Sequence, residues 1–426
     1  MAPHEMDRQA RLPVRPWLRV FLPFAAGYVL SYFLRNVNAV IAPDLSRDLG
    51  ISPGALGLLT SAYLLAFAAA QLPLGIALDR YGPRRVESAL LLIAAAGCGL
   101  FAAGTSLTQL TLGRSLVGFG VSACLMASFK AFGLWFDRER LPSLNAAIMA
   151  AGGLGALSAS TPLSWAVPFL GWRMVFVLLS LACVAASVGI WSTPDKAAGH
   201  DGEPLRLQVV ALVGVLRSRE FWRFAPLSTL TIGGFMAIQG LWAVPWLMNF
   251  NGLGREAAAV HLLLMGTGML AGFLAIAFGL GALNQRGLPP ERVLHVGLGL
   301  GLPATLLIVL GIGPTAVLWW VLGLVFASNN LAYALLQSHF PGALAGRVNT
   351  ALNLLVFLGA FSIQWGFGAL VGLLEDRGAP ARIAFQASFA FLLTLQVASW
   401  VWFSRATPGT PRPPARHGAA PQASPR

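Results

Sequence analysis

The chain carries little charge for its length. Asp, Glu, Lys and Arg make up 11 % of its 426 residues, less than half of the roughly 25 % found in ordinary soluble domains. Hydrophobic residues make up 56 %, and long apolar stretches recur along the whole sequence. So few charges could not cover a soluble surface of this size. The composition therefore excludes a soluble fold and indicates a protein that crosses a lipid bilayer many times.

Lysine is almost absent. All but two of the 29 basic residues are arginine, and the two lysines are Lys130 and Lys196. Neither stands before Ser or Thr in a glycine-rich loop, which excludes a phosphate-binding loop for ATP, and no other cofactor is expected. The arginines are scattered near the ends of the apolar stretches rather than clustered, so we expect no nucleic-acid partner.

Cysteine is scarce as well. Cys98, Cys124 and Cys183 all lie within apolar stretches. The sequence therefore contains no framework of extracellular disulfides, and we expect three small, buried helix residues.

The apolar stretches predict an all-α membrane protein with twelve transmembrane helices, arranged as two pseudo-symmetric six-helix bundles. A helix of about 20 residues crosses the hydrocarbon core of a bilayer, and twelve such segments with short loops use almost the whole chain. The predicted spans are residues 18–41, 55–78, 86–105, 109–135, 142–168, 172–192, 223–248, 256–283, 293–313, 315–338, 348–374 and 382–404.

The longest connection between spans divides the chain into two halves. An internal repeat supports this division, because Asn145 and Asn349 open corresponding helices 204 residues apart. Two six-helix halves in parallel repeat are a common plan of membrane transporters. The predicted organisation is a cytoplasmic tail 1–17, an amino-terminal bundle 18–192, a cytoplasmic linker 193–222, a carboxy-terminal bundle 223–404 and a disordered tail 405–426.

The distribution of arginine predicts the orientation in the membrane. One set of connections, which includes both terminal segments, carries most of the arginines, and the opposite set carries few. Because cytoplasmic loops are enriched in Lys and Arg, we expect both termini in the cytoplasm. The membrane is expected to be a bacterial-type inner membrane.

The connection between the second and third spans contains a specific motif, G-I-A-L-D-R-Y-G-P-R-R, at residues 75–85. It resembles the loop signature of the major facilitator superfamily, and Arg114 in the fourth span resembles that family's second signature. The resemblance covers residues 17–404. An ion-pair latch at this loop is well placed to gate the cytoplasmic side of two rocking bundles, although the charges could also serve only to fix topology. The predicted gating residues are Gly75, Asp79, Arg80, Gly82, Arg84, Arg85 and Arg114.

Acidic residues are missing from the middle of every predicted span. All 16 Asp and Glu lie in loops, in tails or in the first turn of a span, whereas Arg35 and Lys130 lie inside spans one and four. A cation in the membrane costs several kcal/mol unless it is paired. With no carboxylate at hand, the expected partner is an anionic substrate. Either side chain could instead extend to the membrane surface.

Spans one, four, seven and ten line the central cavity in the family that the motif resembles. Tyr28, Tyr32 and Arg35 share one helical face of span one through their i, i+4 and i+7 spacing. The resemblance and this spacing together predict a substrate site. Its residues are Tyr28, Tyr32, Arg35, Met126, Lys130, Met236, Gln239, Asn330, Tyr333 and Gln337.

A soft-metal site is a competing hypothesis. His261, Met265 and Met269 share one face of the eighth span, and imidazole and thioether donors suit Cu(I). This stretch, with Q-G-L-W-A-V-P-W-L at 239–247, resembles a branch of the superfamily that contains copper importers for cytochrome oxidase assembly. Those importers carry Met-x3-Met on span seven, where this chain has Met236 alone. His261 is also the expected proton carrier if transport is linked to protons.

Together these features predict a secondary active transporter that moves a small, anionic organic solute by alternating access. It is expected to work as a monomer in the lipid bilayer, with possible proton coupling, and not to be an enzyme. Copper import through His261, Met265 and Met269 is the alternative within the same family. A membrane sensor that transports nothing is the alternative from another class, although the connection 193–222 is short for a signalling domain.

Overall fold

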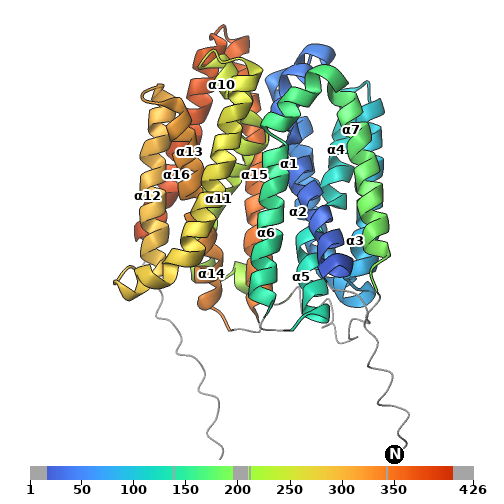
Figure 1. The fold of residues 1–426 in the computed structure, drawn as a ribbon. Helices are drawn as coiled ribbons and strands as arrows, with labels where there is room; N and C mark the ends of the chain where they lie inside the picture. Colours follow the sequence, from blue (N-terminus) through green and yellow to red (C-terminus); the bar gives the residue numbers. More distant parts are fainter. Residues whose placement is uncertain (1–16, 138–139, 195–209, 211–212, 342–343, 406–426) are drawn as a thin grey trace, which may run out of the picture.

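Nearly all described residues are helical, and the helices stand side by side across the molecule (Figure 1). Among the described residues, eleven helical segments are long and apolar enough to cross a membrane, and a shorter apolar helix, Ala147–Ser158, stands among them. The predicted all-α membrane fold is therefore confirmed. Almost all of the predicted tails and most of the predicted linker 193–222 lie outside the described residues. The computed structural model describes residues 17–137, 140–194, 210, 213–341 and 344–405.

The helices form two bundles that follow each other in the chain. The first begins with a π-helical turn at Trp17–Phe21 and contains α1 (Leu22–Leu49), α2 (Pro53–Tyr81), α3 (Pro83–Ala103), α4 (Leu107–Gly120), α5 (Cys124–Trp135), α6 (Leu141–Ser158) and α7 (Thr161–Trp191). The second contains α9 (Arg219–Ala237), α10 (Ala243–Asn249), α11 (Arg255–Gln285), α12 (Pro290–Leu310), α13 (Thr315–Phe326), α14 (Leu331–Ser338), α15 (Ala345–Asp376) and α16 (Ala381–Arg405).

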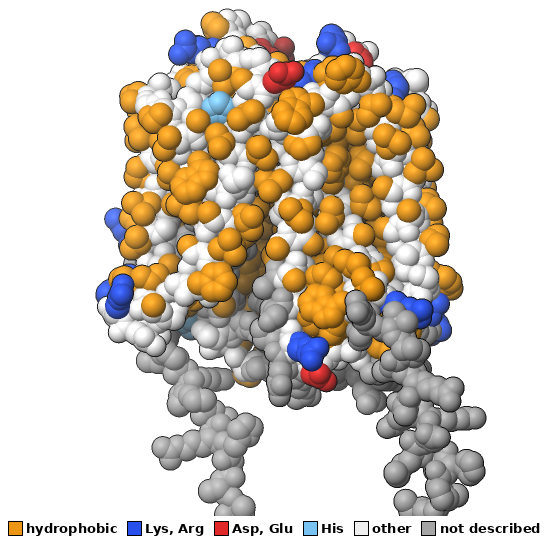
Figure 2. Space-filling view, viewed as in Figure 1, with side chains coloured by type: hydrophobic (Ala, Val, Ile, Leu, Met, Phe, Trp, Pro, Cys, Tyr) orange, Lys and Arg blue, Asp and Glu red, His pale blue; other side chains and the backbone are white. Residues whose placement is uncertain are grey.

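The outer surface fits a lipid environment. Hydrophobic side chains cover the middle of the face seen in Figure 2, whereas charged side chains gather near its two ends. We call the end at which α1 begins and α16 ends the terminal end, and the opposite end the distal end. The distal end carries the loops 50–52, 104–106, 250–254, 311–314 and 377–380.

Three of the predicted spans are interrupted near their middle. A non-helical turn at 121–123 separates α4 from α5, a π-helical turn at Ile238–Trp242 joins α9 to α10, and a 3₁₀ turn at Ala327–Asn330 joins α13 to α14. Irregular backbone at membrane depth is tolerated only where it is buried in protein or lines a cavity. The interruptions therefore mark spans four, seven and ten as interior helices.

The prediction of one continuous helix at 142–168 is wrong. Helix α6 ends at Ser158, and α7 begins at Thr161. The hydroxyls of Ser158 and Ser160 donate to backbone carbonyls of the preceding turn, and such local bonds compete with continued helix. Helix α7 then turns sharply at Gly171, whose φ of 71° is readily adopted only by glycine.

The two bundles pack against each other from their middle toward the distal end. Helix α2 packs along α15, where the rings of Phe67 and Phe357 stack with centroids 4.2 Å apart. The indole of Trp242 donates to the carbonyl of Gln364 at 2.8 Å. Figure 2 shows the surface hollowed between α6 and α11, toward the terminal end. The bundles are thus joined at one end and separated by a hollow at the other.

Candidate functional site

The centre of the site is Arg35 on α1, at the junction of the two bundles. Its guanidinium carbon lies 4.7 Å from the ring centroid of Tyr32 and 5.4 Å from those of Phe67 and Phe357. Since Phe67 belongs to α2 and Phe357 to α15, the arginine lies where the first bundle meets the second. Aromatic faces attract a cation without neutralising it.

Tyrosines surround Arg35. The whole chain has five tyrosines, and four of them, Tyr28, Tyr32, Tyr63 and Tyr333, interact electrostatically with this arginine or its neighbours. The rings of Tyr28 and Tyr32 meet edge to face with centroids 5.1 Å apart. Phenolic hydroxyls both donate and accept hydrogen bonds, so the cluster offers polar contacts around a fixed positive charge.

No carboxylate neutralises Arg35 in the part of the chain that the structure describes. Its Nε atom is buried and has no hydrogen-bond partner there, while the side chain as a whole is half-buried. A buried charge without a partner is costly. The site is therefore electrostatically incomplete and is suited to an anion.

A second arginine, Arg114 on α4, lies beside the same cluster. It is fully buried, its Nη1 donates to the carbonyl of Leu34 at 2.9 Å, and its guanidinium lies 4.9 Å from the ring centroid of Tyr63. These contacts fasten α4 to α1 just before Arg35. Arg114 thus supports the Arg35 site and lies away from the loop at 75–85, so its gating role remains a prediction.

The second bundle contributes neutral polar groups. Tyr333 on α14 donates to Oδ1 of Asn353 on α15 at 3.1 Å. Buried amide atoms of Asn330 and Asn349 have no hydrogen-bond partner among the described residues. Gln239 is buried in the π-helical turn, and Gln337 is half-buried on α14. These groups could bind hydroxyl or carbonyl oxygens of a solute.

The other predicted site residues are spread over the interior helices. Met126 is exposed on α5 and Lys130 is half-buried on the same helix, while Met236 is half-buried on α9. Their roles in substrate binding remain predictions.

The loop at 75–85 is described in part. The Asp79 side chain lies outside the described residues, so the predicted latch is not tested. Arg80 stacks on Tyr81, and Arg84 donates from Nε to the carbonyl of Trp191 at 2.8 Å. Arg84 therefore ties the start of α3 to the end of α7. Gly75 and Arg85 are exposed, and Gly82 has a φ of 79°.

The predicted soft-metal donors belong to helix packing in this conformation. Met265 and Met269 are buried on α11, and the backbone of both packs against Gly323 of α13. His261 is half-buried, with Nδ1 2.7 Å from the carbonyl oxygen of Ala257. No group of three or more His, Cys, Asp or Glu suited to a metal occurs among the described residues.

Sequence reasoning missed two buried acids. Helix α1 continues to Leu49, so Asp44 lies within it rather than in a loop, and its Oδ1 forms ion pairs with Arg47 at 2.9 Å and Arg255 at 2.6 Å. The Arg255 pair joins the two bundles at the distal end. Glu87 is the fifth residue of α3 and is fully buried. Both acids still lie toward the ends of their helices, but the sequence did not predict that they are buried or that Asp44 lies within a helix.

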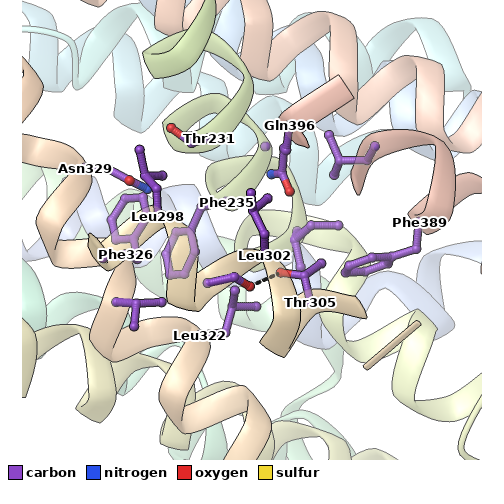
Figure 3. A pocket seen from close by; sticks show the side chains of 16 residues that line it. Thr231, Phe235, Leu298, Leu302, Thr305, Leu322, Phe326, Asn329, Phe389 and Gln396 are labelled. Atoms are coloured by element: carbon purple, nitrogen blue, oxygen red, sulfur yellow. Dashed lines mark hydrogen bonds between the residues drawn. The ribbon is translucent and has the colours of Figure 1, made fainter. Parts of the chain in front are cut away.

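A cavity of about 60 Å³ lies inside the second bundle, between α9, α12, α13 and α16. Most of the residues that line it are apolar, and Figure 3 shows the polar residues Thr231, Asn329 and Gln396 among them. Arg35 and its tyrosines do not line this cavity. It is therefore separate from the site at the junction of the bundles.

Known proteins resemble this chain in sequence. The family model of the Major Facilitator Superfamily matches residues 24–363. The chain is 26 % identical over 181 residues to the probable galactarate/D-glucarate transporter GudP of Bacillus subtilis, which covers 41 % of this chain and 39 % of that protein. It is 29 % identical over 309 residues to a chloramphenicol resistance protein of Streptomyces lividans. This alignment covers 70 % of this chain and 73 % of that protein.

Among solved structures, a D-xylose-proton symporter has the same fold. It superposes with a TM-score of 0.72 and 15 % identity, covering 92 % of this chain and 98 % of that one. Because the family match spans well over half of the sequence and the fold agrees along nearly all of it, the chain belongs to the Major Facilitator Superfamily.

Proposed function

We propose that this protein is a secondary active transporter of a small organic anion, with Arg35 as the group that binds the negative charge. The observation that carries the proposal is the absence of a described carboxylate partner for Arg35, at the point where the two bundles meet. An ionised carboxylate on the solute would complete this site through charge-assisted hydrogen bonds. The name of GudP, which refers to two dicarboxylic sugar acids, supports an organic acid.

The mechanism that we propose is alternating access. The bundles 18–192 and 223–404 would rock against each other around the Arg35 site, since they are joined distally through Asp44 and Arg255 and separated by a hollow toward the terminal end. The protein would work as a monomer. From the distribution of arginine we place both termini in the cytoplasm of a bacterial-type inner membrane.

Uptake into proteoliposomes tests this proposal. The purified full chain is reconstituted, and uptake of radiolabelled galactarate, other organic acids and neutral D-xylose is measured. We expect uptake of at least one organic acid and none of D-xylose. Arg35→Gln should lower kcat/KM for that acid at least about 100-fold, because removing one partner of a buried charge pair costs about 2–5 kcal/mol. Arg35→Lys should retain part of the activity.

The control is Arg377→Gln, which removes an exposed arginine from a distal loop and should leave uptake unchanged. Insertion of every variant is checked by its yield and by size-exclusion chromatography. Wild-type kinetics in Arg35→Gln would reject Arg35 as the anion-binding group. Absence of uptake for every organic acid would reject the solute class.

A further inference from the structure

Glu87 is a buried acid that anion binding at Arg35 does not use. It lies on α3, near the terminal end, and its side chain is 0 % exposed. Neither carboxylate oxygen has a hydrogen-bond partner among the described residues. The polar side chain that interacts with it is the Cys124 thiol, which is a weak donor. An ionised carboxylate in these surroundings would be costly, so the neutral acid is favoured.

The surroundings of Glu87 are closed and uncharged. A Cβ built on Gly27 of α1 would lie 2.6 Å from Oε1 of Glu87, 3.5 Å from Ile190 of α7 and 3.6 Å from Leu91 of α3. The glycine on α1 therefore makes room for the carboxyl group, and apolar side chains close the space around it. A water molecule needs several polar partners to occupy such a place.

Charged residues on the helices around Glu87 lie elsewhere along those helices. Arg35 lies two turns after Gly27 on α1, and Lys130 lies six residues after Cys124 on α5. On α3 itself, Arg84 is bound to the carbonyl of Trp191 and Arg85 is exposed. From α7 the facing residue is the apolar Ile190. No ion pair of Glu87 is formed among the described residues, and both of its carboxylate oxygens lack a hydrogen-bond partner there.

The second bundle carries a paired acid near the start of α12. Helices α3 and α12 are both 21 residues long and begin 207 residues apart, so Glu87 corresponds to the buried Leu294, and Glu291 lies about one turn nearer the start of its helix. Glu291 forms an ion pair with Arg223. The second bundle thus pairs an acid near the start of α12, whereas the first bundle buries Glu87 on α3 without a basic partner among the described residues.

Cys124 connects Glu87 with the Arg35 site. It is the first residue of α5, directly after the non-helical turn at 121–123. Its thiol interacts with Glu87, and it also interacts electrostatically with Tyr28 and Tyr63 of the arginine cluster. A bend of α5 at this turn would change the contacts of both groups together.

We propose that Glu87 is a proton-binding site of this transporter, occupied in the conformation described here and emptied when α5 moves away from α3. The inference rests on the proposed function and deepens it. Glu87 takes one proton from water while it is exposed to one side of the membrane, carries it as the neutral acid while it is buried, and returns it to water on the other side. One monovalent anion at Arg35 and one proton at Glu87 would then cross together without net charge.

Infrared difference spectroscopy tests the proton directly and needs no substrate. Spectra of the detergent-solubilised full chain are recorded during titration from acid to alkaline pH. We expect a carbonyl band of a buried carboxylic acid in the wild type and in Glu256→Gln, which removes an exposed acid. The band should be missing in Glu87→Gln, whose neutral amide fits the same space. Persistence of the band in Glu87→Gln would overturn the proposal.

A transport measurement separates this inference from the proposed function. An inward gradient of one pH unit can drive about tenfold accumulation of an anion that moves with one proton. With the organic acid identified in the uptake screen, the wild type should show this accumulation. Glu87→Gln should equilibrate the solute without accumulating it. Proton-driven accumulation in Glu87→Gln, together with its loss in His261→Gln, would assign the proton to His261 and reject Glu87. Failure of all uptake would reject the proposed function and leave the infrared result to decide on Glu87.

Discussion

The two bundles each carry an acid in the first turns of a helix at the terminal end and surround it differently. Glu291 in the second bundle is paired with Arg223, which is 6 % exposed. In the first bundle, Glu87 is fully buried and has no basic partner among the described residues. The residue 204 positions before Arg223 is Arg19, which is exposed. The basic partner therefore exists in both halves of the sequence, but in the first bundle it lies at the surface.

The two bundles also differ in charge at their junction. The first bundle places Arg35 there, whereas Gln239 occupies the position 204 residues later. In the first bundle the site is charged and lacks a described acid, and in the second bundle it consists of tyrosine and amide groups such as Tyr333 and Asn353. The repeated architecture thus places a charged group in one half of the junction and neutral polar groups in the other.

The largest expected effect comes from breaking the paired acid. Glu291→Gln leaves the buried Arg223 without its anion; because the Glu291 side chain is itself 39 % exposed, the free energy of unfolding should fall by about 1–3 kcal/mol. Glu87→Gln replaces a neutral acid with a neutral amide and should change the free energy of unfolding by less than about 1 kcal/mol. Denaturant unfolding in detergent measures the free energy of unfolding of both variants.

The double variant Arg223→Met with Glu291→Leu is the matched control for that comparison. It removes both charges of the Arg223–Glu291 ion pair. Replacing a buried ion pair with apolar residues often leaves the free energy of unfolding nearly unchanged. Stability should therefore return to nearly the wild-type value. If Glu87→Gln instead destabilised the protein as much as Glu291→Gln, Glu87 would hold a structural contact and the contrast between the bundles would disappear.

A smaller effect is expected from the neutral contacts of the second bundle. Tyr333→Phe removes the hydroxyl that donates to Asn353, and a neutral hydrogen bond contributes about 1 kcal/mol. The KM for the transported acid should rise about fivefold, against the loss of at least about 100-fold in kcat/KM expected for Arg35→Gln. An equal loss in both variants would show that the second bundle shares charge recognition.

The sequence could predict contacts within one helix but not those between helices. Tyr28, Tyr32 and Arg35 lie on one face because helical geometry sets their directions. Tyr63 and Phe357 reach the same arginine only because α2 and α15 pack closely, which depends on small residues such as Gly57 against the Gln364 backbone. No local pattern specifies that register.

Two errors have physical causes of the same kind. The first span was predicted to end at residue 41, before Pro43, yet α1 continues through this proline to Leu49 and carries Asp44 to Arg255. Tertiary contacts with the second bundle stabilise the extra turns. Glu87 looked like a helix-end acid by position, and its burial depends on Gly27 of another helix.

The smallest effect is expected at the cavity of the second bundle. Thr231 lines this cavity and stands 204 residues after Gly27, the residue that leaves room for Glu87 in the first bundle. Because the Thr231 hydroxyl donates to Leu227 within its own helix, Thr231→Val should change the free energy of unfolding by about 0.5 kcal/mol or less and leave uptake unchanged. A rise in KM larger than that of Tyr333→Phe would instead place the cavity on the path of the solute.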